Sequence, residues 1–481
     1  MAEIQDVIDN SASNSRSPSP AGHWRALFGR QYLMTTLMLC IGVGLYAFNA
    51  FLVSTTLPSA VSEIGGARLL PWASTLYLAA SIVAGASAAT LKSRMGARNA
   101  LIGTTIVFLL GTLLAAHASS IAGVIVGRVL QGLGEGVVAA VCYMLIPEIY
   151  PRHLIPKVFG LEACVWALAA FGGPVLAGIV TETISWRAAF LINIPIVAIF
   201  LATALSVPTQ HAAQALKTAI PASRLTLLLF AFILLLAANL TPLTISRNTM
   251  IGLSMAALVL FVVLDKSALE SILPRGAFSS ATAVGFGLWS VLLMPFAQAS
   301  SGVYLVYSLQ HLWHMGPTTA GTMGALIALS WSATAIGVAN IGSGRMQKAL
   351  IVASVAVEAC GLAGVAFAIL HPSLPLLTLS LIAIGAAFGM GWSFLNQTLM
   401  MASPDGERDK TSSLLPTLQS AGYALGAAFA GLVANSVGFS ETATDLVVRQ
   451  AVSISFFFGF IAVLPAIATS GLMLLKLQTD K

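Results

Sequence analysis

The chain has 481 residues, of which 57% are apolar and only 8% charged, and its formal net charge is +6. Soluble proteins carry about a quarter of charged residues, so this composition excludes a water-soluble fold and predicts a membrane protein. The basic residues stand in ones and twos between apolar runs, and this spacing argues against a nucleic-acid-binding surface.

The first thirty residues are polar and rich in Ser and Pro, without an apolar run of their own. This composition predicts a disordered cytoplasmic tail over 1–30 and not a cleavable signal peptide.

Two groups of six apolar runs follow, each run near the roughly 20 residues that a transmembrane helix needs. Two shorter runs lie between the groups and are joined by the polar stretch TPLTISRN, which predicts a helical hairpin. We therefore expect an all-α membrane protein of fourteen spans, with two six-helix halves and two extra helices between them. The predicted boundaries are an N-terminal half at 31–207, a linker with the hairpin at 208–277 and a C-terminal half at 278–481. The runs are 33–57, 70–91, 100–116, 122–145, 158–180, 188–207, 225–240, 249–264, 279–308, 318–342, 349–370, 374–400, 412–436 and 451–475.

Basic residues give an independent test of this topology. With the N-terminus inside, eighteen of the 23 Lys and Arg residues fall on the inner side and four on the outer side. This asymmetry agrees with the positive-inside rule. It predicts a multi-pass protein of a bacterial-type inner membrane with both termini in the cytoplasm. Twelve spans without the two runs in 225–264 would have the same orientation, so the charges do not decide between twelve and fourteen.

Arg128 and Glu135 are charged residues within the fourth predicted span. A charge at the membrane centre costs at least about 2.5–3.5 kcal/mol, so its presence calls for a functional reason. Seven residues bring the two side chains to within about 20° of one helical face, with Gln131 between them. We expect Glu135 to be the main proton-coupling carboxylate and Arg128 to tune it.

Two further acidic residues lie within apolar runs. Glu162 enters the fifth span from the cytoplasmic side, on the face that carries Trp166 and Gly173. It is predicted to be a second proton site or an inner-gate ligand; alternatively it pairs with Lys157 or Arg152 at the interface. Glu358 lies near the middle of the run at 349–370, where a buried pair is an alternative to a functional role.

Three motifs occur in order between Ala89 and Gly178, and a fourth follows in the next turn. They are LKSRMGAR at 91–98, GRVLQGLG at 127–134, GGPVLAG at 172–178, and SWR at 185–187 followed by FLINIP at 190–195. In order and spacing they resemble the major facilitator superfamily, and specifically its drug:proton antiporters with fourteen spans. The resemblance implies gating roles for Arg94, Gly96 and Arg98 in the loop motif and for Gly173 and Pro174 in the Gly-Pro motif.

Asn49 departs from the family pattern. The fourteen-span group usually carries an Asp several residues before the Leu-Pro of the first span, and Asn49 stands at that place before Leu57-Pro58. Because an amide cannot take up a proton, a coupled proton must bind elsewhere in this chain.

Aromatic and amide side chains in the spans suit a cavity for an amphipathic organic molecule, although aromatics near span ends also form the interfacial belt. The candidates for substrate binding are Tyr46, Asn49, Trp72, Tyr77, Gln131, Gln298, Tyr304, Tyr307, Trp392, Asn396 and Gln397.

The sequence thus predicts a monomeric, proton-coupled secondary transporter that exports small amphipathic solutes or drugs by alternating access, with protons and the lipid bilayer as its other partners. A facilitator or symporter that imports a nutrient or siderophore is the alternative. An enzyme is not expected, because no cluster of catalytic groups stands out. Neither a Walker-type phosphate loop nor a metal-binding pattern occurs, so we expect no cofactor and no metal.

Overall fold

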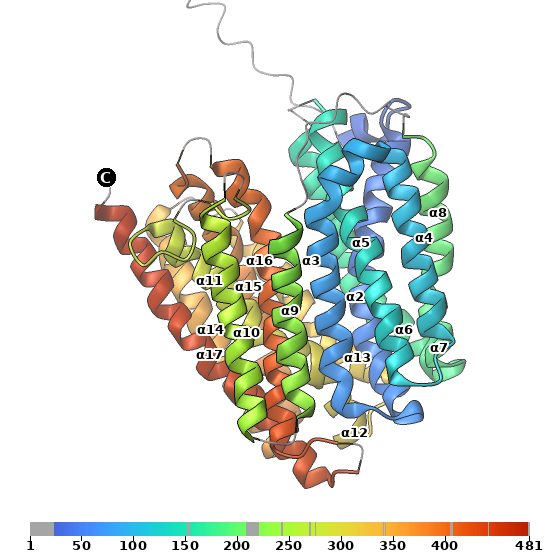
Figure 1. Cartoon of the computed structure of the whole chain (residues 1–481), viewed down its shortest axis with the longest axis vertical. Helices are drawn as coiled ribbons and strands as arrows, with labels where there is room; N and C mark the ends of the chain where they lie inside the picture. The colour runs from blue at the N-terminus through green and yellow to red at the C-terminus, as the bar shows by residue number, and fades with distance from the viewer. Residues whose placement is uncertain are drawn as a thin grey trace, which may run out of the picture.

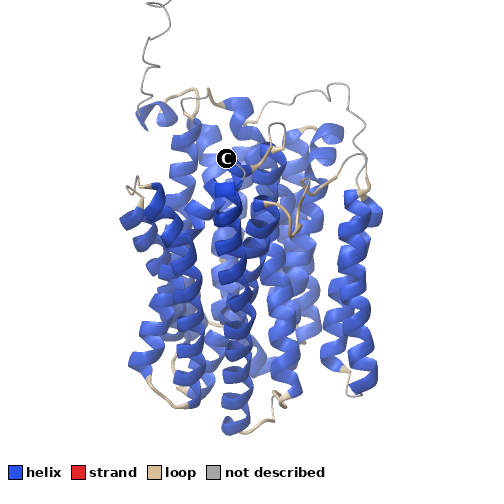
Figure 2. Cartoon of the chain, turned by 90° about the vertical axis from the view of Figure 1, so that its left-hand side faces the viewer, coloured by secondary structure: helices blue, strands red, loops and turns tan. Residues whose placement is uncertain are grey.

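The computed structural model describes residues 24–151, 154–207, 221–241, 244–268, 271–274, 276–339, 341, 343–404, 407–440 and 442–479. Over these residues the secondary structure is helical, without a strand (Figure 2). Fourteen helical stretches are long and apolar enough to cross a membrane. This number confirms the predicted count, including both runs of the central hairpin. Most of the predicted tail, residues 1–23, lies outside the described residues.

The helices η1 to α8 form the N-terminal group. Gly96 adopts a φ of 79° between α3 and α4, a backbone conformation that glycine reaches without steric cost, so the two helices follow each other without a longer loop. The predicted sixth span is broken at Ile192 into two helices, α7 and α8. The bounds are η1 Trp24–Phe28, α2 Leu33–Ile64, η2 Ala67–Leu69, α3 Leu70–Met95, α4 Ala97–Ala116, α5 Ile121–Ile149, α6 Ile155–Thr183, α7 Trp186–Leu191 and α8 Asn193–Ala204.

The hairpin α9 (Ala222–Leu240) and α10 (Thr244–Lys266) lies between the two groups, where α9 contacts α3 on one side and α16 on the other (Figure 1). Asp265, fully buried at the end of α10, pairs with Arg224 and accepts hydrogen bonds from the backbone amides of Ile272 and Leu273 at 3.0 and 2.8 Å. These bonds tie the hairpin to the segment that follows it.

The helices α11 to α17 form the C-terminal group. Its first span is not a continuous α-helix, because a π-helical turn separates α11 from α12. Such turns carry one extra residue and displace the side chains that follow. The bounds are α11 Ala283–Ser300, η3 Ser301–Leu305, α12 Val306–Leu312, α13 Pro317–Val338, α14 Gly344–Leu370, α15 Leu374–Ala402, α16 Arg408–Ser436 and α17 Asp445–Thr479.

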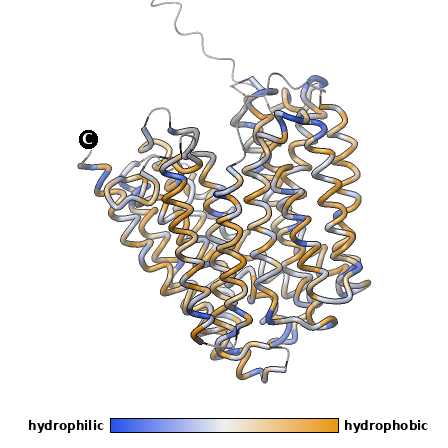
Figure 3. Tube along the Cα trace, in the orientation of Figure 1, coloured by the Kyte–Doolittle hydropathy of each residue, from blue (hydrophilic) through white to orange (hydrophobic). Residues whose placement is uncertain are grey.

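We call the end of the bundle where α2 begins and α17 ends the terminal face, and the other end the far face. In Figure 1 the two groups spread apart toward the terminal face, at the top, and come together at the far face. Hydrophilic residues gather at the two ends, and apolar residues dominate the middle of the helices (Figure 3). This banding is the one expected of a bundle that crosses a bilayer.

Candidate functional site

Glycines of α5 set the framework of the site, because they let neighbouring helices approach closely. A Cβ placed on Gly132 would lie 2.3 Å from the Tyr77 carbonyl oxygen of α3, and one on Gly136 would lie 2.2 Å from the Ser81 carbonyl oxygen. On another side of α5, a Cβ on Gly134 would lie 2.4 Å from the Thr104 carbonyl oxygen of α4. The helix α5 therefore packs directly against the backbones of α3 and α4.

Glu135 is fully buried on α5 between α2 and α3. Its Oε2 accepts a hydrogen bond from the Tyr77 hydroxyl at 2.8 Å and another from the Asn49 amide at 3.1 Å, while Oε1 has no hydrogen-bond partner. Two donors at one oxygen favour the charged carboxylate, whereas burial and the unpartnered second oxygen disfavour it. The opposing effects leave a carboxyl group able to exist in either state.

Arg128 lies nearly two helical turns before Glu135 and is also buried. Its guanidinium carbon lies 3.7 Å from the centroid of the Tyr77 ring, and its Nη1 donates to the Gln131 Oε1 at 2.7 Å. Tyr77 thus contacts the cation through its ring and the carboxylate through its hydroxyl. The two charged groups predicted to share one face are linked through an aromatic side chain of the neighbouring helix.

Thr112 and Asn193, to which the sequence analysis gave no role, complete this network. Gln131 donates to the Thr112 hydroxyl of α4 at 2.9 Å, and Asn193 of α8 donates to the Asn49 Oδ1 at 3.3 Å. Both are buried polar residues of apolar spans, and such burial is the signal that could have singled them out. The network spans five helices of the N-terminal group.

Glu162 lies on α6 with only 3% of its surface exposed, and neither carboxylate oxygen has a hydrogen-bond partner among the described residues. The proposed pairing with Lys157 is not formed, and Arg152 lies outside the described residues. One turn further along α6, the Trp166 ring packs edge-on against the Tyr46 ring of α2, with the ring centroids 5.7 Å apart. The Tyr46 hydroxyl faces Ser420 of α16. Through Tyr46, the Trp166 ring is connected to the side of α2 that faces the other group.

The residues of the predicted gating motifs lie in two places. A Cβ on Gly173 would lie 3.0 Å from that of Phe51 on α2, so α6 packs closely on α2 just before Pro174. Gly96 forms the α3–α4 junction, Arg94 beside it is exposed, and Arg98 lies in the first turn of α4.

The charged contact of the loop motif comes from a residue outside the predicted gating set. Lys92 forms an ion pair with Glu148 near the end of α5. Ser93 of the same motif donates to the Thr90 carbonyl of its own helix at 2.8 Å.

The substrate candidates of the C-terminal group do not form one cluster. Gln298 of α11 accepts a hydrogen bond from the Tyr423 hydroxyl of α16 at 2.8 Å, and Tyr423 had not been singled out from the sequence. Tyr304 and Tyr307 pack against Phe439 with ring centroids at 5.0 and 5.1 Å.

The remaining candidates lie on α15 and at the start of α3. Trp392 packs on Phe388 of its own helix at 5.4 Å, and Asn396 follows one turn later with its Oδ1 unpartnered. Gln397 is exposed, on the stripe of α15 that carries the exposed Met401. Trp72 belongs to the packing near the hairpin.

Several hydrogen bonds between the two groups lie in the half of the bundle nearer the far face. Glu182 at the end of α6 accepts from the Thr318 amide and hydroxyl of α13 at 2.8 and 2.7 Å. Gln310 of α12 accepts from Ser59 at 3.1 Å and donates to the Thr55 carbonyl of α2 at 3.2 Å. These contacts join the two groups near the far face.

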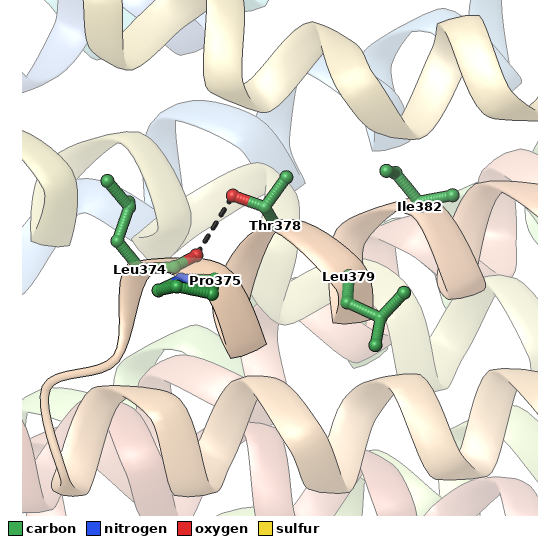
Figure 4. Close-up of a pocket in the computed structure, with 5 residues that line it drawn as sticks. All are labelled: Leu374, Pro375, Thr378, Leu379 and Ile382. Carbon is green, nitrogen blue, oxygen red and sulfur yellow. Dashed lines mark hydrogen bonds between the residues drawn. The ribbon is translucent and has the colours of Figure 1, made fainter.

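A shallow depression of about 390 Å³ on α15 lies apart from these networks (Figure 4). Its lining is apolar except for Thr378, whose hydroxyl donates to the Leu374 carbonyl at 2.9 Å. Leu374, Leu379 and Ile382 are exposed there by 41, 65 and 40%. An exposed apolar wall of this kind fits lipid contact better than solute recognition.

Comparison with known proteins places this geometry in context. The family model of the Major Facilitator Superfamily matches residues 39–341. A protein of Mycobacterium tuberculosis named "Probable multidrug-efflux transporter" is 30% identical over 446 residues, covering 89% of this chain and 93% of that protein. The riboflavin transporter RibZ of Clostridioides difficile is 23% identical over 414 residues, covering 83% of this chain and 88% of its own.

Solved structures agree on the fold. The POT family transporter PepTSo superposes with a TM-score of 0.65 at 12% identity, covering 92% of this chain and 98% of that one. A bacterial homologue of the human lysosomal transporter Spinster superposes with a TM-score of 0.64 at 13% identity, covering 93 and 97%. The chain is thus a multi-pass membrane transporter and not an enzyme, and it belongs to the Major Facilitator Superfamily.

Proposed function

We propose that this protein exports small amphipathic organic solutes across the inner membrane in exchange for protons, with Glu135 as the coupling carboxylate. The observation that supports this proposal is the buried network in which Glu135 accepts from Tyr77 and Asn49 while Arg128 stacks on the same tyrosine. A carboxyl group so placed is neutral when protonated and partly compensated when charged. It can therefore load and release a proton as the two groups rock.

In this proposal the terminal face is the cytoplasmic side, and a monomer carries out the whole cycle. With the far face closed by the bonds at Glu182 and Gln310, the structure represents the state that receives solute from the cytoplasm. We assign Tyr46, Trp166 and Glu162 to the solute path, where aromatic rings suit an amphipathic molecule. Proton binding to Glu162 would neutralise a second carboxylate on that path.

The test is transport into inverted proteoliposomes with an imposed pH gradient and a panel of cationic dyes, sugars and siderophores. Wild-type protein is expected to drive dye uptake only with the gradient present. Glu135→Gln should abolish the gradient-dependent part, about 10²-fold or more if the proton step is lost. Asp445→Asn, at a carboxylate 62% exposed near the far face, is the matched control. Full gradient-driven transport by Glu135→Gln would disprove the assignment.

A second candidate is an importer of a nutrient or siderophore, by facilitation or symport. It is favoured by Asn49 at the usual acidic position and by the presence of a transporter of riboflavin, a nutrient, among the relatives. Collapsing the proton gradient in cells distinguishes the two: accumulated solute should rise for an exporter and fall for a symporter.

A further inference from the structure

Glu358 is a second deeply buried carboxyl group, and it lies in the C-terminal group, outside the network of Glu135. It stands at the midpoint of α14 and is fully buried, and neither of its carboxylate oxygens has a hydrogen-bond partner among the described residues. A charged carboxylate without a partner at this depth is unstable by several kcal/mol. The group must therefore be neutralised by a bound proton or another cation.

Among the described residues, the helices that pack around Glu358 place no charged residue at its depth that could do this. The helices α11 and α15 carry no Asp, Glu, Lys or Arg, and those of α17, including Asp445 and Lys476, are near its ends. On α16 the charged residues are confined to the first turn, Arg408 to Lys410. Tyr423 of α16 is a further titratable group at mid-depth of the same half.

A polar pair of the C-terminal group lies on α11 and α16, and α16 packs on α3 of the N-terminal group. The Tyr423 hydroxyl donates to the Gln298 Oε1 at 2.8 Å. Gln298 lies on α11, the first span of its group, as Asn49 lies on the first span of the other group next to Glu135. Each group therefore contains a buried carboxyl group and an amide and a tyrosine, but among the described residues only Glu135 is hydrogen-bonded to them, and only the N-terminal group adds an arginine.

We infer that Glu358 is a second proton-binding site, which releases and regains one proton in each transport cycle. The inference rests on the proposed function, because it assigns an additional proton to the same exchange. Without an arginine beside it, Glu358 is charged only while the C-terminal group exposes it to water. The protein would then move one proton per cycle more than the Glu135 network alone can provide.

The experiment measures the limiting accumulation of a transported dye in proteoliposomes, with the membrane potential clamped at zero and one pH unit across the membrane. Each coupled proton contributes a factor of about ten at this gradient. Glu358→Gln should therefore lower the limiting ratio about tenfold, and Glu358→Asp should keep it. An unchanged ratio in Glu358→Gln would overturn the inference, whereas a wild-type ratio that ignores the gradient would instead refute proton coupling as a whole.

A second measurement needs neither a substrate nor a stable variant. Dicyclohexylcarbodiimide modifies protonated carboxyl groups in apolar surroundings, and mass spectrometry of the wild-type chain locates the modified residue. Modification of Glu358 should decline as the pH rises, with Glu148, the exposed partner of Lys92, as an internal reference. A Glu358 peptide that stays unmodified at every pH would contradict the proposed site.

Discussion

At the residue scale, the contact between Asn49 and Glu135 suggests that the coupling carboxylate can change places with an amide. The Asn49 amide nitrogen lies 3.1 Å from the Glu135 Oε2, so Asn49→Asp combined with Glu135→Gln would preserve the pair with its partners exchanged. Asp at this position would still lie within reach of the Asn193 amide, 3.3 Å from the Asn49 Oδ1.

We expect the double variant to recover a measurable part of the gradient-driven dye uptake that Glu135→Gln loses, although a displacement of about 1 Å can cost up to about 10²-fold in rate. Uptake in proteoliposomes is the measurement. The control is Ser54→Asp combined with Glu135→Gln, which should give no rescue. Ser54 lies on the same helix, and its hydroxyl donates to the Phe51 carbonyl. Equal recovery by both double variants would mean that any added carboxylate suffices and that the network has no special role.

The same residues show what the sequence could predict at this scale. Helical spacing predicts that Arg128, Gln131 and Glu135 share a face, and the structure places Arg128 on Gln131 and Glu135 within one network. The bridging position of Tyr77 depends on how far α3 is displaced along α5. That displacement is set by contacts at Gly132 and Gly136, which the spacing within one helix does not reveal.

At the element scale, the glycines of α5 give a prediction about helix packing. Gly132→Ala would place a Cβ 2.3 Å from the Tyr77 carbonyl oxygen, and α3 must move to relieve the clash. Overpacking of this kind typically costs about 1–3 kcal/mol. It should also separate Tyr77 from Glu135.

The melting temperature of the detergent-solubilised protein is expected to fall by a few degrees, and transport should drop with it. Gly103→Ala on α4 is the matched control, because nothing lies within 4 Å of its added Cβ. A Gly132→Ala protein with unchanged melting temperature and transport would show that α3 and α5 are not held at this spacing.

Element boundaries illustrate a limit of hydropathy. The length of the apolar runs predicts all fourteen spans, because the bilayer sets the number of residues that a crossing needs. The break at Ile192 and the π-helical turn at Ser301–Leu305 leave the hydropathy unchanged. They arise from backbone hydrogen bonding, which side-chain polarity does not report.

At the scale of the whole molecule, sequence predicts the orientation of the spans but not which face is closed. Both states of an alternating carrier contain the same helices, and they differ by only a few kcal/mol in the contacts between the groups. In this structure those contacts include the bonds of Glu182 to Thr318 and of Gln310 to Ser59 and Thr55. Removing some of them should therefore shift the population toward the state that opens at the far face.

Glu182→Ala removes the acceptor of two hydrogen bonds, each worth about 0.5–1.5 kcal/mol or more with a charged partner. A shift of this size multiplies the open population about fivefold to more than tenfold. A cysteine introduced at the half-buried Ser59 should then react faster with an impermeant maleimide by a similar factor. A cysteine at the exposed Ser62, one turn further along α2, should react at the same rate with and without the substitution. If both cysteines react faster in the Glu182→Ala protein, the end of α2 has unfolded. If the cysteine at position 59 does not react faster, the bonds at Glu182 do not keep the far face closed. Only a faster maleimide reaction confined to the cysteine at position 59 would identify Glu182 as a residue that holds the two groups together at the far face.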